Sequence, residues 1–395
     1  MSYDESRRQF LKYLAASPAL AYAQSTRRYA GLGDGLISSP EHAVNVFDFA
    51  SVAENVLPPA HWGYLKTSID DDATVRRNRE GFTHYQLRPR RLIDVRHIDM
   101  SIELCGKKWP TPIVIAPTGG NQAFHPEGEI AVARAARAKN HLQMLSTVAS
   151  TAIEDVIEAR GEPVWYQLYP IYDWTATEKM VKRAEAAGCP VVALTVDNTM
   201  GSNRETVKRF AKLDERDCSV CHTTDYPRPR PMYEGLDIPE RTDYRSSIDW
   251  EFVRRLREST SMKVLIKGIV RADDAELAVE NGVDGLIVSN HGARAVATDR
   301  STIECLPEVV DAVRGRIVVL IDSGFRRGTD FFKALALGAD AVCIGRPYLW
   351  GLASFGQAGV EAVLDLLRAE LELVMKQAGT TSIDQIEPSY LAEKG

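Results

Sequence analysis

The sequence lacks an apolar run of about 18 residues, which an ordinary transmembrane helix requires. It has only 6 cysteines among 395 residues, too few for a fold built on disulfides. Its formal net charge of -6 provides no general positive field, so nucleic acid and anionic lipid are not expected partners. With 45% hydrophobic and 26% charged residues, the composition is that of a globular enzyme, and we expect its partner to be a small molecule.

The N-terminus has the pattern of an export signal. Residues 6–12 read Ser-Arg-Arg-Gln-Phe-Leu-Lys, and the weakly apolar stretch 13–23 ends in Ala-Tyr-Ala, like a small-residue cleavage site. This segment resembles a twin-arginine signal, so we expect 1–23 to be removed and the protein to be periplasmic. The alternative is an amphipathic N-terminal helix on a cytoplasmic protein, which Pro18 and the Ala-Tyr-Ala ending disfavour.

From residue 111 onward, short β-rich apolar runs alternate with segments of helical period, which is typical of parallel βα units. The eight candidate strands are 111–118, 143–147, 164–169, 191–197, 263–269, 285–290, 317–322 and 341–345. The clearest helical segments are 127–139, 176–187, 272–281 and 329–337. Eight such units in about 260 residues predict one closed (β/α)8 TIM barrel over 111–395.

Two further regions accompany the barrel. Residues 24–110 form an N-terminal extension, in which 44–82 predicts two or three short helices and 91–104 predicts a hairpin that closes the barrel's N-terminal end. Residues 205–245, after the fourth strand, show little periodicity. A loop of that length is usually functional, and its position predicts an insertion on the catalytic face.

The ends of the predicted strands are polar. In this fold those positions ring the active site. They are Thr118, Ser146, Gln167, Tyr169, Thr195, Asp197, Lys267, Ser289, His291, Asp322, Gly345 and Arg346. Such a set predicts a pocket for a polar, partly anionic ligand. The loops after strands seven and eight, 322–328 and 345–347, combine glycines with arginines and predict a phosphate site, the alternative being glycine turns with surface arginines.

One histidine has the surroundings of a catalytic base. His291 is followed by Arg294, and Asp197 closes another strand, where it can orient the imidazole and stabilise its protonated form. A lone histidine is more often packed or solvated, but these neighbours favour a base. Arg204 and Arg294 together suit a substrate carboxylate, because each guanidinium makes a two-pronged contact.

The motifs of the chain, in order, resemble those of the FMN-dependent 2-hydroxy-acid oxidases and dehydrogenases, which include glycolate oxidase, lactate oxidase and mandelate dehydrogenase. The resemblance covers about residues 45–390. It rests on Ile-Ala-Pro-Thr-Gly at 115–119, His-Pro-Glu-Gly-Glu at 125–129, Tyr-Gln-Leu-Tyr at 166–169, Leu-Thr-Val-Asp at 194–197, Lys-Gly at 267–268, Ser-Asn-His-Gly-Ala-Arg at 289–294, Arg-Arg-Gly-Thr-Asp at 326–330 and Ile-Gly-Arg-Pro at 344–347.

This resemblance implies a role for each matching residue. His291 would take a proton from an (S)-2-hydroxy acid with Asp197 as its partner, and Lys267 would neutralise charge on the reduced flavin. The substrate would be held by Tyr64, Tyr169, Arg204, His291 and Arg294. The flavin ring would contact Pro117, Thr118, Gly119, Ser146, Gln167, Thr195, Lys267 and Ser289. The ribityl phosphate would bind at Asp322, Gly324, Arg326, Gly345 and Arg346.

The resemblance also implies a homo-oligomer that needs FMN, and no metal site is expected. The electron acceptor stays open: it is oxygen, an acceptor protein or a haem on the separate motif described below. The sequence departs from the family at Val148, where the short-substrate oxidases carry a large aromatic residue, so bulkier acids are expected to fit. Two other interpretations stay open. One is a lyase or aldolase that forms a Schiff base on Lys267, and the other is an electron-transfer flavoprotein without catalysis.

A separate motif lies in the predicted insertion. Cys218-Ser219-Val220-Cys221-His222 matches the C-x-x-C-H pattern at which haem c is attached through Cys218 and Cys221, with His222 as an iron ligand. A disulfide between the two cysteines and a small metal clip with His222 are the alternatives.

Overall fold

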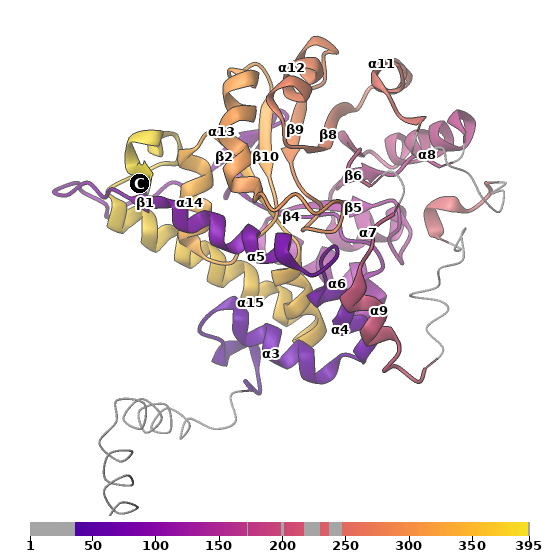
Figure 1. The fold of residues 1–395 in the computed structure, drawn as a ribbon, viewed down its shortest axis with the longest axis horizontal. Coiled ribbons are helices and arrows are strands. Elements are labelled where there is room, and N and C mark those ends of the chain that lie inside the picture. The colour runs from indigo at the N-terminus through magenta and orange to yellow at the C-terminus, as the bar shows by residue number, and fades with distance from the viewer. Residues whose placement is uncertain (1–35, 172, 199–200, 217–229, 237–246, 394–395) are drawn as a thin grey trace, which may run out of the picture. The chain divides into compact units, whose positions relative to one another are not determined.

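The computed structural model describes residues 36–171, 173–198, 201–216, 230–236 and 247–393 (Figure 1). Eight parallel strands close into a barrel in the order β10-β11-β4-β5-β6-β7-β8-β9. They are β4 (Ile113–Ile115), β5 (Leu142–Ser146), β6 (Trp165–Leu168), β7 (Val191–Thr195), β8 (Lys263–Ile269), β9 (Gly285–Val288), β10 (Val318–Ile321) and β11 (Ala341–Ile344). All eight predicted strands are present, so the TIM-barrel prediction is confirmed.

The strands are buried almost throughout, because the barrel interior packs against one face and the helices against the other. Inside the barrel, Val114, Leu265 and Leu320 belong to one apolar cluster. Closing the sheet leaves no unpaired edge, so the polar groups of the strands are satisfied and only their carboxyl ends are open to a ligand.

A hairpin covers the N-terminal end of this core, later in the chain than predicted. Its strands are β2 (Ile102–Leu104) and β3 (Lys107–Trp109), not 91–104, and Leu104 and Trp109 join the barrel cluster. The turn consists of Cys105 and Gly106, both at positive φ (53° and 84°), which two-residue hairpin turns favour. Cysteine is an unusual residue for the first of these positions, so the sequence pattern did not reveal the turn.

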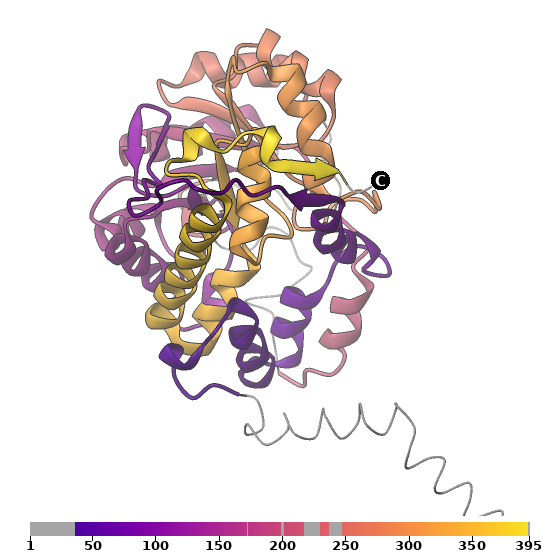
Figure 2. The same ribbon diagram turned by 90° about the vertical axis from the view of Figure 1, so that its left-hand side faces the viewer.

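Helices surround the barrel, and the helices of the N-terminal extension pack beside them (Figures 1 and 2). The α15 helix packs against α3 and α6, and α14 packs against α15. The outer helices are α6 (Gly128–Lys139), α7 (Ile153–Arg160), α8 (Trp174–Ala186), α11 (Trp250–Ser259), α12 (Ala272–Glu280), α13 (Thr302–Val313), α14 (Gly328–Ala336) and α15 (Arg346–Ala378). The extension supplies α3 (Val46–Val56), α4 (Pro59–Lys66) and α5 (Ala73–Glu80), as predicted for 44–82.

The remaining elements are short. They are β1 (Tyr85–Leu87), which pairs with β12 (Leu391–Glu393), and the 3-10 turns η1 (Pro40–His42), η2 (Gly81–His84), η3 (Asn121–Ala123), η4 (Pro231–Tyr233), η6 (Ile383–Gln385) and η7 (Pro388–Tyr390). The described residues from Ser39 onward form one compact unit. None of the helices described is both long and apolar enough to span a bilayer.

The long connection after β7 is anchored on the extension. Its helix α9 (Glu205–Ala211) packs on α4 so closely that a Cβ on Gly63 would lie 2.4 Å from Cβ of Phe210. The Ala60 N–H donates to Asp214 (3.1 Å), and the Asp70 N–H donates to the carbonyl of Asn203 (2.7 Å). These contacts bring Arg204, at the start of α9, next to the extension.

We expect Gly328→Ala to destabilise the fold. A Cβ on Gly328, the first residue of α14, would lie 2.3 Å from the backbone carbonyl carbon of Glu370 on α15, which cannot move aside like a flexible side chain. Overpacking of this kind costs about 1–3 kcal/mol, which lowers the thermal midpoint by a few degrees. The neighbouring change Thr329→Ala adds no atoms and serves as the control in thermal denaturation. Equal midpoints for the two variants would contradict the close contact between α14 and α15.

Candidate active site

A cavity lies at the carboxyl ends of the barrel strands, and most of the residues predicted from sequence line it. These are Tyr64, Pro117, Thr118, Gly119, Ser146, Gln167, Tyr169, Thr195, Lys267, His291, Arg294, Asp322, Gly324, Arg326, Gly345 and Arg346. Asp197 and Ser289 do not line the cavity themselves but hydrogen-bond to His291, which does. Arg204 lies over the ring of Tyr64, another lining residue. The structure therefore gathers at one site every predicted residue that it describes.

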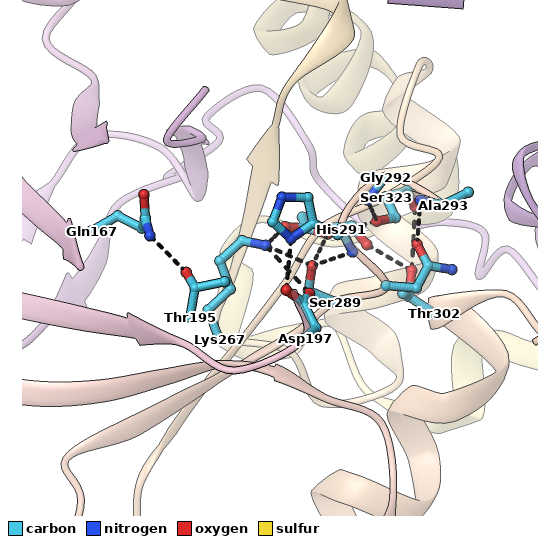
Figure 3. Close-up of polar contacts among 12 residues, drawn as sticks. Gln167, Thr195, Asp197, Lys267, Ser289, His291, Gly292, Ala293, Thr302 and Ser323 are labelled. Carbon is cyan, nitrogen blue, oxygen red and sulfur yellow. Dashed lines mark hydrogen bonds and ion pairs between the residues drawn. The ribbon is translucent and has the colours of Figure 1, made fainter. Parts of the chain in front are cut away.

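Polar side chains cross the floor of the cavity from strand to strand (Figure 3). Ser146 donates to Gln167 Oε1 (2.9 Å), and Gln167 Nε2 donates to Thr195 Oγ1 (2.9 Å). Lys267 Nζ then donates to Ser289 Oγ (2.8 Å). The strand register explains the order, because Ser146 is paired with Gln167 and Thr195 with Lys267. Strand pairing thus sets Ser146 beside Gln167 and Thr195 beside Lys267, and the Gln167 side chain reaches Thr195, two residues beyond its own partner Ala193.

His291 is held by two partners from other strands. Its Nδ1 lies 2.6 Å from Asp197 Oδ1, and its Nε2 lies 3.0 Å from the Tyr169 hydroxyl. Because a carboxylate only accepts, Nδ1 carries the hydrogen, and in the neutral ring the lone pair of Nε2 faces the Tyr169 hydroxyl at the cavity. The backbone of His291 is left-handed (φ 59°), a conformation that costs energy for a residue other than glycine and is often found at functional sites.

A buried charge cluster supports this histidine. Lys267 Nζ lies 3.3 Å from Asp322 Oδ2 and 3.9 Å from Asp197 Oδ2. Burial acts to lower the pKa of Lys267, but the carboxylates of Asp322 and Asp197 outweigh it and raise that pKa above its usual value. Burial likewise acts to raise the pKa of Asp197, yet His291 and Lys267 bring it below the usual range. The lysine is therefore a fixed cation and Asp197 a fixed anion.

Two arginines meet at Tyr64. The guanidinium carbon of Arg294 lies 4.7 Å from the centroid of the Tyr64 ring and that of Arg204 lies 5.8 Å from it. Arg294 Nη2 donates to the Tyr64 carbonyl (2.6 Å), whereas its buried Nε has no hydrogen-bond partner among the described residues. Burial lowers the pKa of Arg294. An unpaired donor on a buried cation is costly, so this end of the cavity suits a carboxylate.

The predicted phosphate site joins the loop after β10 to α5. A Cβ on Gly324 (φ 93°) would lie 2.1 Å from the carbonyl oxygen of Asn78, so only glycine allows this approach. Arg79 donates to the Gly324 carbonyl and to Asp330 (2.5 Å). Burial lowers the pKa of Arg326 to about 9, with Arg79 adding to the effect, as expected for a buried cation short of anions.

Arg346, which was predicted for the same phosphate site, hydrogen-bonds to backbone carbonyl groups. Its guanidinium donates to the carbonyl oxygens of Leu65 (2.7 Å), Thr67 (2.8 Å) and Gly292 (3.0 Å). These bonds tie the extension and the His291 loop to the start of α15. The side chain still borders the cavity, so its charge acts on any anion there.

Sequence reasoning missed several residues at the site. Phe124 and Leu349 line the cavity and Arg79 supports the phosphate loop, but none of them closes a strand or belongs to a quoted motif. Arg230 also lines the cavity, and the alternation Pro-Arg-Pro-Arg-Pro at 227–231 was the signal that could have revealed it. Cys218, Cys221 and His222 lie outside the described residues, as does the segment 1–23.

Comparison with known proteins places this chain in a family. Residues 53–393 match the FMN-dependent dehydrogenase family, and the chain belongs to it. Similar proteins include the peroxisomal (S)-2-hydroxy-acid oxidase GLO4 of Oryza sativa subsp. japonica, 42% identical over 89% of this chain and 96% of the relative. L-lactate oxidase of Lysinibacillus sphaericus (strain C3-41) is 41% identical over 87% and 91% of the two chains.

Solved structures agree with this membership. A soluble mutant of the membrane-associated (S)-mandelate dehydrogenase from Pseudomonas putida superposes with a TM-score of 0.82 and 34% identity, covering 89% of this chain and 100% of the other. The protein is therefore an FMN-dependent enzyme with the fold of the 2-hydroxy-acid oxidases and dehydrogenases.

The cavity fits FMN by its own chemistry. The row from Ser146 to Ser289 supplies donors and acceptors for the polar edge of a flavin ring, and Lys267 is a cation set within that row. Arg326 and the glycine-containing loops at the other end supply the charge and close backbone approach that a phosphate needs. Among the described residues no cluster could hold a metal ion.

We expect Arg326→Gln to weaken FMN binding about 10-fold or more, because a buried charge-assisted contact to phosphate is lost. The adjacent Arg327→Gln is the matched control, since Arg327 is exposed and lies 3.2 Å from Glu370. Quenching of flavin fluorescence during titration of the apoprotein measures both. If the two variants bind FMN equally well, Arg326 does not hold the phosphate.

Proposed function

We propose that the protein oxidises an (S)-2-hydroxy acid to the corresponding 2-keto acid. The observation that carries the proposal is the meeting of His291 Nε2, the unpartnered Nε of Arg294 and the Lys267 ammonium around one cavity. A base, a carboxylate binder and a fixed cation are the groups that this oxidation requires. The relatives named above act on 2-hydroxy acids, which agrees with this chemistry.

Arg204, Arg294 and Tyr64 hold the substrate carboxylate, which directs the hydroxyl-bearing carbon toward His291. In the oxidation the substrate loses two electrons and two protons, and bound FMN would supply the acceptor for both electrons and for one of the protons. His291 Nε2 accepts the other proton. Asp197 then stabilises the resulting imidazolium, because its carboxylate lies 2.6 Å from Nδ1. Tyr169, hydrogen-bonded to Nε2, holds the substrate oxygen beside the base.

Lys267 has an electrostatic task in this scheme. Its ammonium is held in place by Ser289 and Asp322, so it stabilises negative charge that develops nearby without having to move. The same geometry disfavours the alternative of a lyase or aldolase. A Schiff-base lysine must be a free amine to act as a nucleophile, and the two carboxylates keep Lys267 protonated. The alternative of an electron-transfer flavoprotein without catalysis gives no role to His291 or to Arg204 and Arg294.

We expect His291→Gln to retain FMN and to lose substrate-driven flavin reduction by about 10²-fold or more, because the base is removed while the phosphate site stays intact. Anaerobic mixing with a 2-hydroxy acid, followed by flavin absorbance, measures the rate. Flavin content of the purified variant is the control for folding. Reduction at a near-normal rate in the flavin-loaded variant would exclude His291 as the base.

We also propose that the protein is exported through Arg7 and Arg8 and that Cys218 and Cys221 attach a haem, with His222 as its iron ligand. The C-x-x-C-H pattern and the N-terminal signal pattern support this, and the motif follows β7 on the catalytic side, where an electron acceptor is useful. If no haem is attached, oxygen or a separate acceptor protein takes the electrons from the reduced flavin. A homo-oligomer is the expected assembly.

Fractionation of cells that carry haem-attachment machinery tests both ideas. We expect the protein in the periplasmic fraction, with a haem-stained band on a denaturing gel that Cys218→Ala abolishes. Arg7→Lys with Arg8→Lys keeps the charge but removes the receptor-read address, so this variant is expected in the cytoplasm. If the double variant is still found in the periplasm with its N-terminus cleaved, Arg7 and Arg8 are not an export signal. An unstained wild-type band at the polypeptide mass would leave a disulfide or metal clip as the role of the motif.

A further inference from the structure

Arg230 reaches the active-site cavity from the long connection after β7. It lines the cavity together with Gly119, Gly120 and Val148. Its Nη1 lies 3.9 Å from the position that a Cβ on Gly120 would occupy. The Gly120 N–H in turn donates to the carbonyl of Val148 (3.1 Å), so the guanidinium lies beside the wall formed by Val148. The side chain of the substrate is expected at this wall, because Val148 lines the cavity with a small apolar side chain.

The backbone around Arg230 is well anchored. Met232 and Tyr233, in the η4 turn, are 2% and 5% exposed, and the Tyr233 N–H donates to the Arg230 carbonyl (2.8 Å). Arg183 on α8 donates to the Pro231 carbonyl (2.5 Å) and is itself fixed by two hydrogen bonds to Glu154 (2.8 and 2.9 Å). The arginine therefore enters the cavity from a fixed point on the barrel.

Each of the other cationic side chains that line the cavity is paired with a carboxylate or is assigned to an anionic group of FMN or of the substrate. Lys267 is paired with Asp322, the lone carboxylate among the described lining residues. Four arginines remain, namely Arg230, Arg294, Arg326 and Arg346. The FMN phosphate carries about two negative charges and the carboxylate of the substrate carries one, so these four arginines, with Arg204 beside them, leave positive charge unmatched. Within the described chain no ion pair or hydrogen bond engages the guanidinium of Arg230.

We propose that Arg230 binds a second carboxylate at the far end of the substrate, so that the preferred substrate is a 2-hydroxydicarboxylic acid. The inference rests on the proposed function. Arg204, Arg294 and Tyr64 mark one end of the bound acid, and Arg230 beside Val148 marks the other. The small Val148 side chain leaves the path between the two ends open, and a planar guanidinium matches a carboxylate with two parallel contacts.

Paired substrates test this assignment. (S)-Malate is compared with (S)-2-hydroxybutanoate, and (S)-2-hydroxyglutarate with (S)-2-hydroxypentanoate, because each pair differs by a terminal carboxylate in place of a methyl group. We expect kcat/KM of the wild type to favour at least one dicarboxylate by about 10-fold or more. Arg230→Gln removes this preference through KM and changes the monocarboxylates by less than about 2-fold. Added salt weakens the preference.

Arg209→Gln is the matched control, because Arg209 is an exposed arginine of the same connection that pairs with Glu205 (2.8 Å). This variant is expected to keep the dicarboxylate preference, and Arg230→Lys is expected to retain part of it. Flavin content checks the folding of each variant. Equal use of both acids by the wild type, or an equal loss for both in Arg230→Gln, overturns the inference while leaving the oxidation itself intact. Failure of all four acids to reduce the flavin overturns the proposed function as well.

Discussion

The buried carboxylate of Asp197 connects His291 and Lys267, the two groups to which the proposed function assigns the chemistry. It bonds His291 Nδ1 at 2.6 Å and lies 3.9 Å from Lys267 Nζ, so it fixes the imidazole and shares its charge with the lysine. Burying a charge is costly unless oppositely charged partners surround it, and here both partners are themselves held by the barrel. The backbone is shaped around this carboxylate. A Cβ on Gly268 (φ 118°) would lie 2.6 Å from Cβ of Asp197, so glycine is required there.

Barrel closure makes this arrangement possible. Parallel strands in a fixed register bring residues that are distant in sequence side by side, so Ser146 pairs with Gln167, and the Gln167 side chain continues the row to Thr195. The apolar interior below them, with Trp109 at the closed end, excludes water and stabilises the fold independently of the polar face. The polar, highly charged site is therefore carried by strands that the apolar barrel interior stabilises.

The sequence predicted the features that follow from periodicity and from strand ends. All eight strands appear where alternating βα patterns placed them, and His291, Asp197 and Lys267 meet because strand termini share one face. The hairpin at 102–109 was misplaced, since its turn uses Cys105 in a conformation that sequence patterns do not associate with cysteine. Contacts made by loops were also missed. Nothing in local sequence indicates that Arg346 donates to three backbone carbonyls of other segments, and for Arg230 the signal was limited to the Pro-Arg alternation at 227–231.

The most direct test of the account is anaerobic mixing of the FMN-loaded protein with a panel of (S)-2-hydroxy acids that includes mono- and dicarboxylates. The account predicts that at least one acid bleaches the flavin absorbance and yields one equivalent of the 2-keto acid per flavin, while the (R) enantiomer does not. A flavin that stays oxidised with every acid of the panel would contradict the assignment of His291, Asp197, Arg204 and Arg294 to this oxidation.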